Sequence, residues 1–257
     1  MTIKNFILIR YKRRGWDNMP QYIHEKYAKM NMDEWDEVQE NLLKQQIQQI
    51  KNFYPKCNIH LITNDKSRID SSLIIHYFPE MQSNHVSKLK IYGLINEPAM
   101  YLDNDIIINK RWNEEQLFTK NEMNLYGISK SYDVQSLACD KLPAQMNQHY
   151  QGGVIWIKSP SKKLSDELFE IHEKYFSDKQ KIKNQGRWAD SDELPISLYA
   201  KKNKIEMKLD STISVNRVTL NKSELKNYQS IHYTGIDIEV KKLCLKEYKE
   251  INTKIYL

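Results

Sequence analysis

Short apolar runs alternate with amphipathic stretches in the first part of the chain, and this alternation constrains the fold most. Residues 33–53 place Trp35, Val38 and Leu42 at helical spacing, which predicts an amphipathic helix with Asp33 at its start and Pro55 after its end. Strand, helix and strand in this order predict parallel crossover connections and a layered α/β sheet. The runs that we interpret as buried strands are 6–10, 59–63, 73–77 and 99–102.

The remaining segments extend the same pattern. We expect a mixed, mainly parallel sheet flanked by helices, in a single domain that spans residues 1–257. The lysine-rich stretch 236–257 is predicted to be a C-terminal extension packed back over the sheet. Further strands are predicted at 124–129 and 153–157, and further helices at 86–96, 161–176 and 191–200.

Composition and charge narrow the classes of protein. The net charge of +6 mildly favours anionic partners such as nucleotides, phosphates or a membrane surface, but it is too small and dispersed to predict nucleic-acid binding. No apolar run is long enough for a transmembrane helix, although peripheral membrane association stays open. The cysteines, Cys57, Cys139 and Cys244, have no metal-type spacing, which favours reduced thiols and a cytoplasmic location.

Two aspartates interrupt the apolar stretch 99–108. If this stretch is extended, alternate side chains share one face, so Asp103 and Asp105 point the same way. Two carboxylates on one side repel each other unless a cation lies between them, and oxygen ligands suit Mg²⁺ or Mn²⁺. A surface turn with two solvated aspartates is the alternative, but the apolar flanks favour a metal site.

The sequence Tyr-Leu-Asp-Asn-Asp-Ile-Ile-Ile at 101–108 resembles the Asp-x-Asp strand of GT-A fold glycosyltransferases that use nucleotide sugars. The likeness is greatest to the family 8-like group, which includes glycogenin and bacterial lipopolysaccharide galactosyltransferases. Three more segments resemble motifs of that group in the same order: 151–157, 188–196 and 230–235. The resemblance implies a divalent cation, usually Mn²⁺, that bridges the donor diphosphate and is held by Asp103, Asp105 and His232.

The resemblance also implies roles around the transferred sugar. Asp192 and Glu193 would lie near the sugar, with Gln151 on a hydroxyl and Asp192 nearest the reacting carbon of a retaining reaction. Acidic residues at a helix start also serve as caps, and a lone histidine is often structural, so both alternatives stay open. We place Asn104, Gly152, Gly153, Gly235 and the basic Lys88 in the donor site.

The first two predicted strands end in polar residues that we expect at the nucleoside. Tyr11 follows Arg10 and is suited to stack on a base, and Asp65 can accept from a uracil N–H or a ribose hydroxyl. One departure from the family is clear, because residues 236–239 replace its Lys-Pro-Trp. Lys241 or Lys242 is a candidate substitute for that diphosphate-binding lysine.

The sequence therefore predicts a metal-dependent hexosyltransferase with a nucleotide-sugar donor, by default a UDP-sugar, and a glycan or other hydroxyl acceptor. A haloacid dehalogenase-type phosphatase also uses Asp-x-Asp after an apolar strand, although normally near the N-terminus. A non-catalytic glycan- or nucleotide-binding module of the same fold is the second alternative. The glycine-rich motifs of dinucleotide-binding and P-loop proteins are absent from the sequence.

Overall fold

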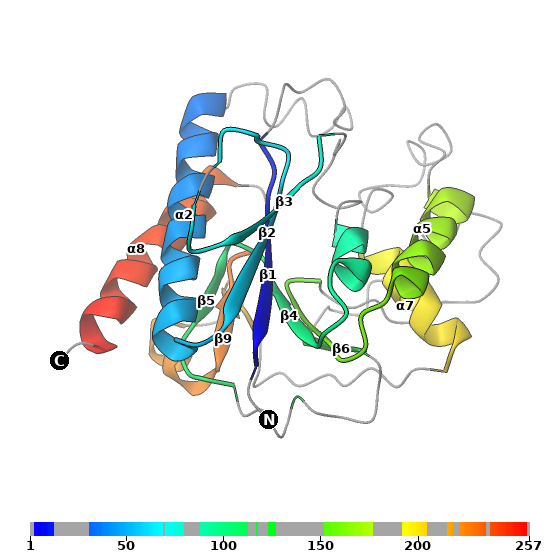
Figure 1. Cartoon of the computed structure of the whole chain (residues 1–257). Helices are drawn as coiled ribbons and strands as arrows, with labels where there is room; N and C mark the ends of the chain where they lie inside the picture. Colours follow the sequence, from blue (N-terminus) through cyan, green and yellow to red (C-terminus); the bar gives the residue numbers. More distant parts are fainter. Residues whose placement is uncertain are drawn as a thin grey trace.

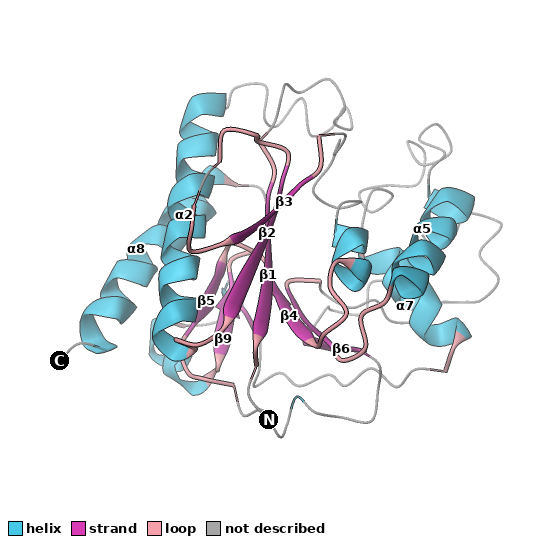
Figure 2. Ribbon diagram, in the orientation of Figure 1, coloured by secondary structure: helices cyan, strands magenta, loops and turns pink. Residues whose placement is uncertain are grey.

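A computed structural model gives the arrangement of most of the chain. Its larger sheet has the order β3-β2-β1-β4-β7-β6, with neighbouring strands parallel from β3 to β4 and β7 antiparallel to both β4 and β6 (Figures 1 and 2). The predicted mixed, mainly parallel sheet is thus confirmed. The described residues are 3–12, 31–68, 70–79, 88–112, 117, 123–126, 152–176, 192–204, 215–217, 221–234 and 237–255.

Each strand of this sheet forms where the sequence predicts an apolar run, to within one residue at most ends. The central strands β1, β2, β4 and β7 are buried on both faces, as strands covered by helices require, whereas the edge strand β3 is only half-buried. The strands are β1 (Asn5–Arg10), β2 (Asn58–Thr63), β3 (Ile74–Tyr77), β4 (Ala99–Leu102), β6 (Met123–Tyr126) and β7 (Val154–Ile157).

Helices cover the two faces of the sheet with separate apolar layers. Phe6 and Leu8 of β1 face α2 (Met32–Phe53), whereas Ile7 and Ile9 face the layer formed with α5 (Lys162–Phe176) and α7 (Glu193–Lys202). This alternation follows from the two-residue repeat of a strand. Figure 1 shows α2 on one side of the sheet and α5 and α7 on the other.

Helix α2 begins and ends close to the predicted bounds. Asn31 is the N-cap, and its side chain accepts hydrogen bonds from the backbone N–H groups of Asp33 and Glu34, so the helix starts at Met32 rather than Asp33. Its buried stripe contains two glutamines, Gln46 and Gln49, in addition to the expected apolar side chains. Buried amides need hydrogen-bond partners: Gln49 accepts from the Ile108 N–H of the second sheet at 2.9 Å, and Gln46 bonds to the site described below.

A second, smaller sheet lies beside the first. It has the order β5-β9-β8, from β5 (Ile106–Ile108), β9 (Ser230–His232) and β8 (Val215–Asn216). The 3₁₀ helix η4 (Lys222–Asn227) precedes β9. Helix α8 (Ile238–Ile255) packs with α2 over this sheet around a core that includes Leu42, Ile107 and Tyr248. Figure 1 shows α2 and α8 side by side.

One predicted helix differs in type over the residues that the structure describes. Residues 86–96 were expected to form an amphipathic helix, but Leu89–Gly93 form the 3₁₀ helix η1, and residues 80–87 lie outside the described part. Leu89, Ile91 and Tyr92 are all buried, although no α-helix places these three positions on one narrow stripe. Among the described residues, no helix is long and apolar enough to cross a membrane.

Candidate metal and donor site

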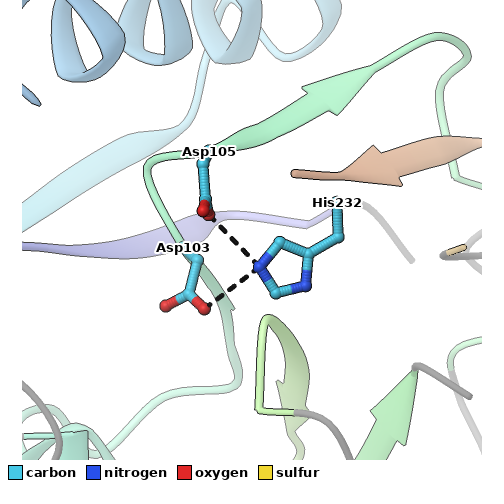
Figure 3. A group of neighbouring side chains, drawn as sticks. All are labelled: Asp103, Asp105 and His232. Atoms are coloured by element: carbon cyan, nitrogen blue, oxygen red, sulfur yellow. Dashed lines mark ion pairs between the residues drawn. The ribbon is translucent and has the colours of Figure 1, made fainter. Parts of the chain in front are cut away.

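The Asp-x-Asp segment is a turn that joins the two sheets. Strand β4 ends at Leu102, β5 begins at Ile106, and the Ile106 N–H donates to the Asp103 carbonyl at 3.2 Å. From the sequence, Asp103 and Asp105 were expected to share one side because side chains alternate along an extended strand. That explanation is wrong, because the two residues lie in a turn. The turn itself brings Asp103 and Asp105 toward the same point, as Figure 3 shows.

His232 comes to this point from far along the chain because β9 pairs with β5, with His232 opposite Ile106. Its Nε2 lies 3.2 Å from Asp105 Oδ1 and 3.5 Å from Asp103 Oδ2 (Figure 3). One potential ligand atom from each of these residues lies within 4.8 Å of the other two. The ordered resemblance thus corresponds to a real convergence of Asp103, Asp105 and His232.

Two carboxylates and an imidazole form a donor set that suits a divalent first-row ion. Carboxylate oxygens alone suit Mg²⁺ or Mn²⁺, and the added imidazole nitrogen favours Mn²⁺. Nε2 is the ring nitrogen of His232 that lies next to both carboxylates, so it is the atom placed to serve as the ligand. The residues present therefore fit a metal ion.

Hydrogen bonds from several elements fix the backbone of the turn. Gln46 of α2 donates to the Asp103 carbonyl at 2.6 Å, which explains one buried glutamine of that helix. This bond and four others restrict the conformation of the segment that carries the two carboxylates. The others run from Asp103 N to Gly153 O at 2.8 Å, Tyr233 N to Asp105 O at 3.0 Å, Asn104 Nδ2 to Ile9 O at 2.8 Å, and Tyr248 Oη to Ile106 O.

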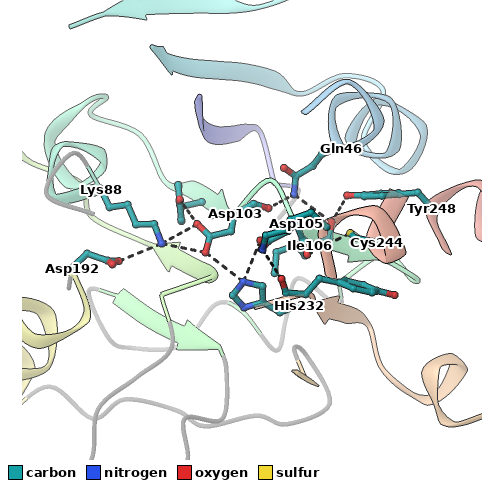
Figure 4. Close-up of polar contacts among 12 residues, drawn as sticks. Gln46, Lys88, Asp103, Asp105, Ile106, Asp192, His232, Cys244 and Tyr248 are labelled. Atoms are coloured by element: carbon teal, nitrogen blue, oxygen red, sulfur yellow. Dashed lines mark hydrogen bonds and ion pairs between the residues drawn. The ribbon is translucent and has the colours of Figure 1, made fainter. Parts of the chain in front are cut away.

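Two lysines neutralise the carboxylates, and Figure 4 shows one of them, Lys88, between Asp103 and Asp192. Lys88 Nζ, just before η1, lies 2.9 Å from Asp103 Oδ1 and 3.6 Å from Asp192 Oδ2. Lys241 of α8 contacts Asp105 Oδ2 and donates to the Tyr233 carbonyl at 2.7 Å. Lys88 thus links Asp192, the residue before α7, to the Asp-x-Asp turn. The two predicted site residues Lys88 and Asp192 therefore lie in one cluster with the predicted metal ligands.

These charges set the protonation of the acidic residues. Burial raises the pKa of Asp105, but the Lys241 ammonium and His232 outweigh it and hold that pKa well below its ordinary value. Burial and the neighbouring Asp103 carboxylate raise the pKa of Tyr101, whose hydroxyl donates to Asp103. Asp105 is therefore ionised and ready to bind a cation at neutral pH.

Gly153, one of the glycines predicted beside the sugar, has a steric role toward His232. A Cβ on Gly153 would lie 2.5 Å from both Cε1 and Nδ1 of His232, too close for any side chain. Both Gly152 and Gly153 are buried in the turn before β7. Only glycine at position 153 allows the imidazole to reach the carboxylates from this side.

The predicted nucleoside edge lies at the carboxyl ends of β1 and β2, next to the end of β4. Arg10 is buried and its guanidinium contacts Asp36 at 3.0 Å and Glu40 at 3.6 Å, both on α2. Asp65 accepts from the backbone and hydroxyl of Ser67. Their expected contacts with a nucleotide stay predictions, as does that of Tyr11, which packs against the α5 layer.

The two polar atoms of the Asn104 side chain differ in their hydrogen bonding. Nδ2 donates to the Ile9 carbonyl, whereas the buried Oδ1 has no hydrogen-bond partner among the described residues. Gln151 and Gly235 lie outside the described residues, and so does the side chain of Glu193, the first residue of α7.

Sequence reasoning missed three side chains that shape the site, Gln46, Tyr101 and Tyr248. The only signal for Gln46 was a glutamine at a buried position of the helical repeat. Tyr101 directly precedes the turn, but its apolar neighbours suggested a purely structural role. Nothing local marks Tyr248, because its partner Ile106 is 142 residues away.

The larger sheet and the helices on its two faces form the GT-A fold that the sequence predicts. Among solved structures, the chain is similar to the galactosyltransferase LgtC in complex with donor and acceptor sugar analogues, with a TM-score of 0.57 and 11% identity over 97% of this chain and 95% of that one. An active-site mutant of LgtC gives a TM-score of 0.50 and 10% identity at the same coverage. No family model matches the sequence, and no curated protein does. At these identities the likeness shows the fold, which is the fold that the sequence predicts.

Proposed function

We propose that the chain is a metal-dependent glycosyltransferase that moves a hexose from a nucleotide diphosphate sugar to a glycan or other hydroxyl acceptor. The observation that carries the proposal is the convergence of Asp103, Asp105 and His232 at the carboxyl end of β4. Ligands in open α/β sheets bind at such strand ends. The glycosyltransferase fold supports the same activity, and a UDP-sugar is the donor that we propose.

The chain's own residues suit the chemistry of a departing nucleotide. A divalent ion, when bound, would stabilise the negative charge that develops on the leaving diphosphate. Asp103, Asp105 and His232 would hold that ion, and Lys88 is positioned to bind a phosphate beside it. Asn104, whose side chain donates to the Ile9 carbonyl beside the turn, is proposed to line the donor site.

We propose that Asp192 is the carboxylate nearest the reacting carbon and that the reaction retains the configuration of the sugar. Asp192 is 2% exposed and is linked to the Asp-x-Asp turn through Lys88. A fixed carboxylate can stabilise an oxocarbenium-like centre. Glu193 and Gln151 are proposed with it, and Gly152 and Gly235 are proposed to line the donor site. A single domain, a cytoplasmic location and peripheral membrane association stay predictions.

The central test is nucleotide release from a panel of nucleotide sugars with Mn²⁺. We expect turnover with a UDP-sugar, its loss with EDTA, and a fall of at least about a hundredfold in Asp105→Asn, because the metal loses a charged ligand. Asp166→Asn, on the exposed face of α5, is the matched control and should keep full activity. Full turnover in EDTA or in Asp105→Asn would contradict the proposal.

The same samples separate the two alternative functions. Hydrolysis of phosphate monoesters without nucleotide-sugar turnover would indicate a phosphatase. Metal-dependent stabilisation by UDP without any sugar release would indicate a binding module. The position of the motif after β4, rather than after the first strand, and the histidine opposite it favour the transferase.

A further inference from the structure

Lys241 places a buried ammonium group on the outer oxygen of a proposed metal ligand. Asp105 turns Oδ1 toward His232 and Oδ2 toward Lys241 Nζ, so its two oxygens contact two different partners. Lys241 also donates to the Tyr233 carbonyl at 2.7 Å and is only 4% exposed. A lysine this buried is rare unless it is paired, and Asp105 is its pair.

Helix α8 holds Lys241 firmly in this place. One turn further on, Cys244 Sγ lies 3.9 Å from the Asp105 carbonyl, and Tyr248 donates to the Ile106 carbonyl. Glu247 accepts from the Tyr233 hydroxyl and from Arg217 at 3.0 Å. These contacts fix α8 against β5 and β9. Lys241 is therefore held in a defined position in the site and is not a mobile surface side chain.

The charged side chains of the cluster determine how strongly the site attracts a free metal ion. Three carboxylates, from Asp103, Asp105 and Asp192, are opposed by the two ammonium groups of Lys88 and Lys241, which leaves one net negative charge with His232 neutral. A divalent ion that approaches alone is repelled by both ammonium groups at short range. A nucleotide diphosphate brings negative charge of its own, which offsets that repulsion.

We propose that Lys241 is an internal counter-ion of Asp105 that keeps the affinity for the metal ion low until the donor diphosphate binds. Lys241 is thus a positioning residue that couples metal binding to nucleotide binding, an inference that rests on the proposed function. Coupling of this kind is reciprocal, so the metal ion must raise nucleotide affinity by the same factor.

The test measures Mn²⁺ binding directly, from the electron paramagnetic resonance signal of free Mn²⁺, with and without UDP. In the wild-type protein, UDP should tighten Mn²⁺ binding strongly. In Lys241→Met, which keeps the aliphatic stem, we expect Mn²⁺ alone to bind about tenfold more tightly than in the wild type and the effect of UDP to shrink by a similar factor. Lys241→Gln, which keeps a donor for the Tyr233 carbonyl, should change in the same direction.

Lys246→Met is the matched control. Lys246 lies on the same helix α8, but it is exposed and has no place in the site. Its loss should leave Mn²⁺ affinity as in the wild type, and the melting curves of all variants report whether they fold.

The outcomes distinguish this inference from the proposed function. Mn²⁺ binding that is equal or weaker in both Lys241 variants overturns the inference but leaves the metal site standing. Wild-type Mn²⁺ affinity that does not change with UDP overturns the inference without recourse to any variant. If no form of the protein binds Mn²⁺, with or without UDP, the proposed metal site falls and the inference with it.

Discussion

At the scale of single residues, Gly153 is the position where one added methyl group has the most direct effect on the site. In Gly153→Ala the new Cβ would lie 2.5 Å from the imidazole of His232, so the ring must move away from the carboxylates. We expect Mn²⁺ affinity measured with UDP present to fall by about ten- to a hundredfold, as when the support of a metal ligand is lost.

The melting temperature of Gly153→Ala separates a moved ligand from a damaged fold. The substitution lies at the edge of β7, and His232 can tilt without disturbing the pairing of β4 with β7. Unchanged Mn²⁺ affinity in a folded variant would show that His232 is a structural histidine, the alternative that the sequence left open.

The sequence predicted the metal cluster at the residue scale but not its geometry. Asp103 and Asp105 stand out because they interrupt an apolar stretch, and a motif resemblance led to His232. Their convergence depends on a turn between two sheets and on the pairing of β5 with β9. Strand alternation cannot supply either, because register between distant segments is set by tertiary packing.

At the scale of elements, helix α2 supports the Asp-x-Asp turn as well as the sheet. Gln46 is fully buried and its amide donates to the Asp103 carbonyl at 2.6 Å and to the Ile106 carbonyl at 3.4 Å. In Gln46→Leu these buried carbonyls lose a donor, so we expect the free energy of unfolding to fall by about 1–3 kcal/mol. Urea denaturation measures this change.

Gln48→Leu on the same helix is the control for the Gln46 prediction. Gln48 is exposed and bonds only Asn52 among the described residues, so its loss should change stability by less than about 0.5 kcal/mol. Equal stabilities of the two variants would show that the bonds from α2 to the turn do not matter for folding.

Elements were predicted where a simple repeat dominates and missed where it does not. The strands are continuous apolar runs, so their centres can be found without any knowledge of their neighbours. Residues 89–93 were misjudged in type because their apolar side chains are buried from several directions around η1, where Gly93 packs closely against α5. A helical repeat and a compact 3₁₀ turn look alike over so few residues.

At the scale of the whole molecule, α8 shows what a sequence cannot predict. Residues 236–257 looked like a lysine-rich appendage, yet Lys241 lies on Asp105, 136 residues away along the chain. From the sequence we expected an extension packed back over the sheet but no helix, and nothing there indicated that α2 and the small sheet together form the docking surface of α8. Lys241, whose contact with Asp105 the family resemblance did not predict, thus comes from residues 236–257, where the sequence was least informative.

The stability of the whole molecule should also depend on a histidine pair far from the metal cluster. His60 of β2 and His76 of β3 share a hydrogen bond of 3.0 Å between Nδ1 and Nε2. Burial, with a smaller contribution from His76, lowers the pKa of His60 from its ordinary value to about 4. Burial lowers the pKa of His76 as well.

The sign of the pH effect follows from these lowered pKa values. In the unfolded chain His60 binds a proton near pH 6.5, whereas the folded protein keeps it neutral down to about pH 4, so acid favours the unfolded state. Stability that is fully present above about pH 6.5 should therefore be lost as the pH falls toward 4, by up to about 3 kcal/mol from His60 alone.

Urea denaturation across this range measures the loss. His60→Gln isolates it from the carboxylates, because the variant should lose distinctly less stability than the wild type over the same interval. Parallel pH profiles of the two proteins would show that the histidine pair takes up its proton without opposing the fold.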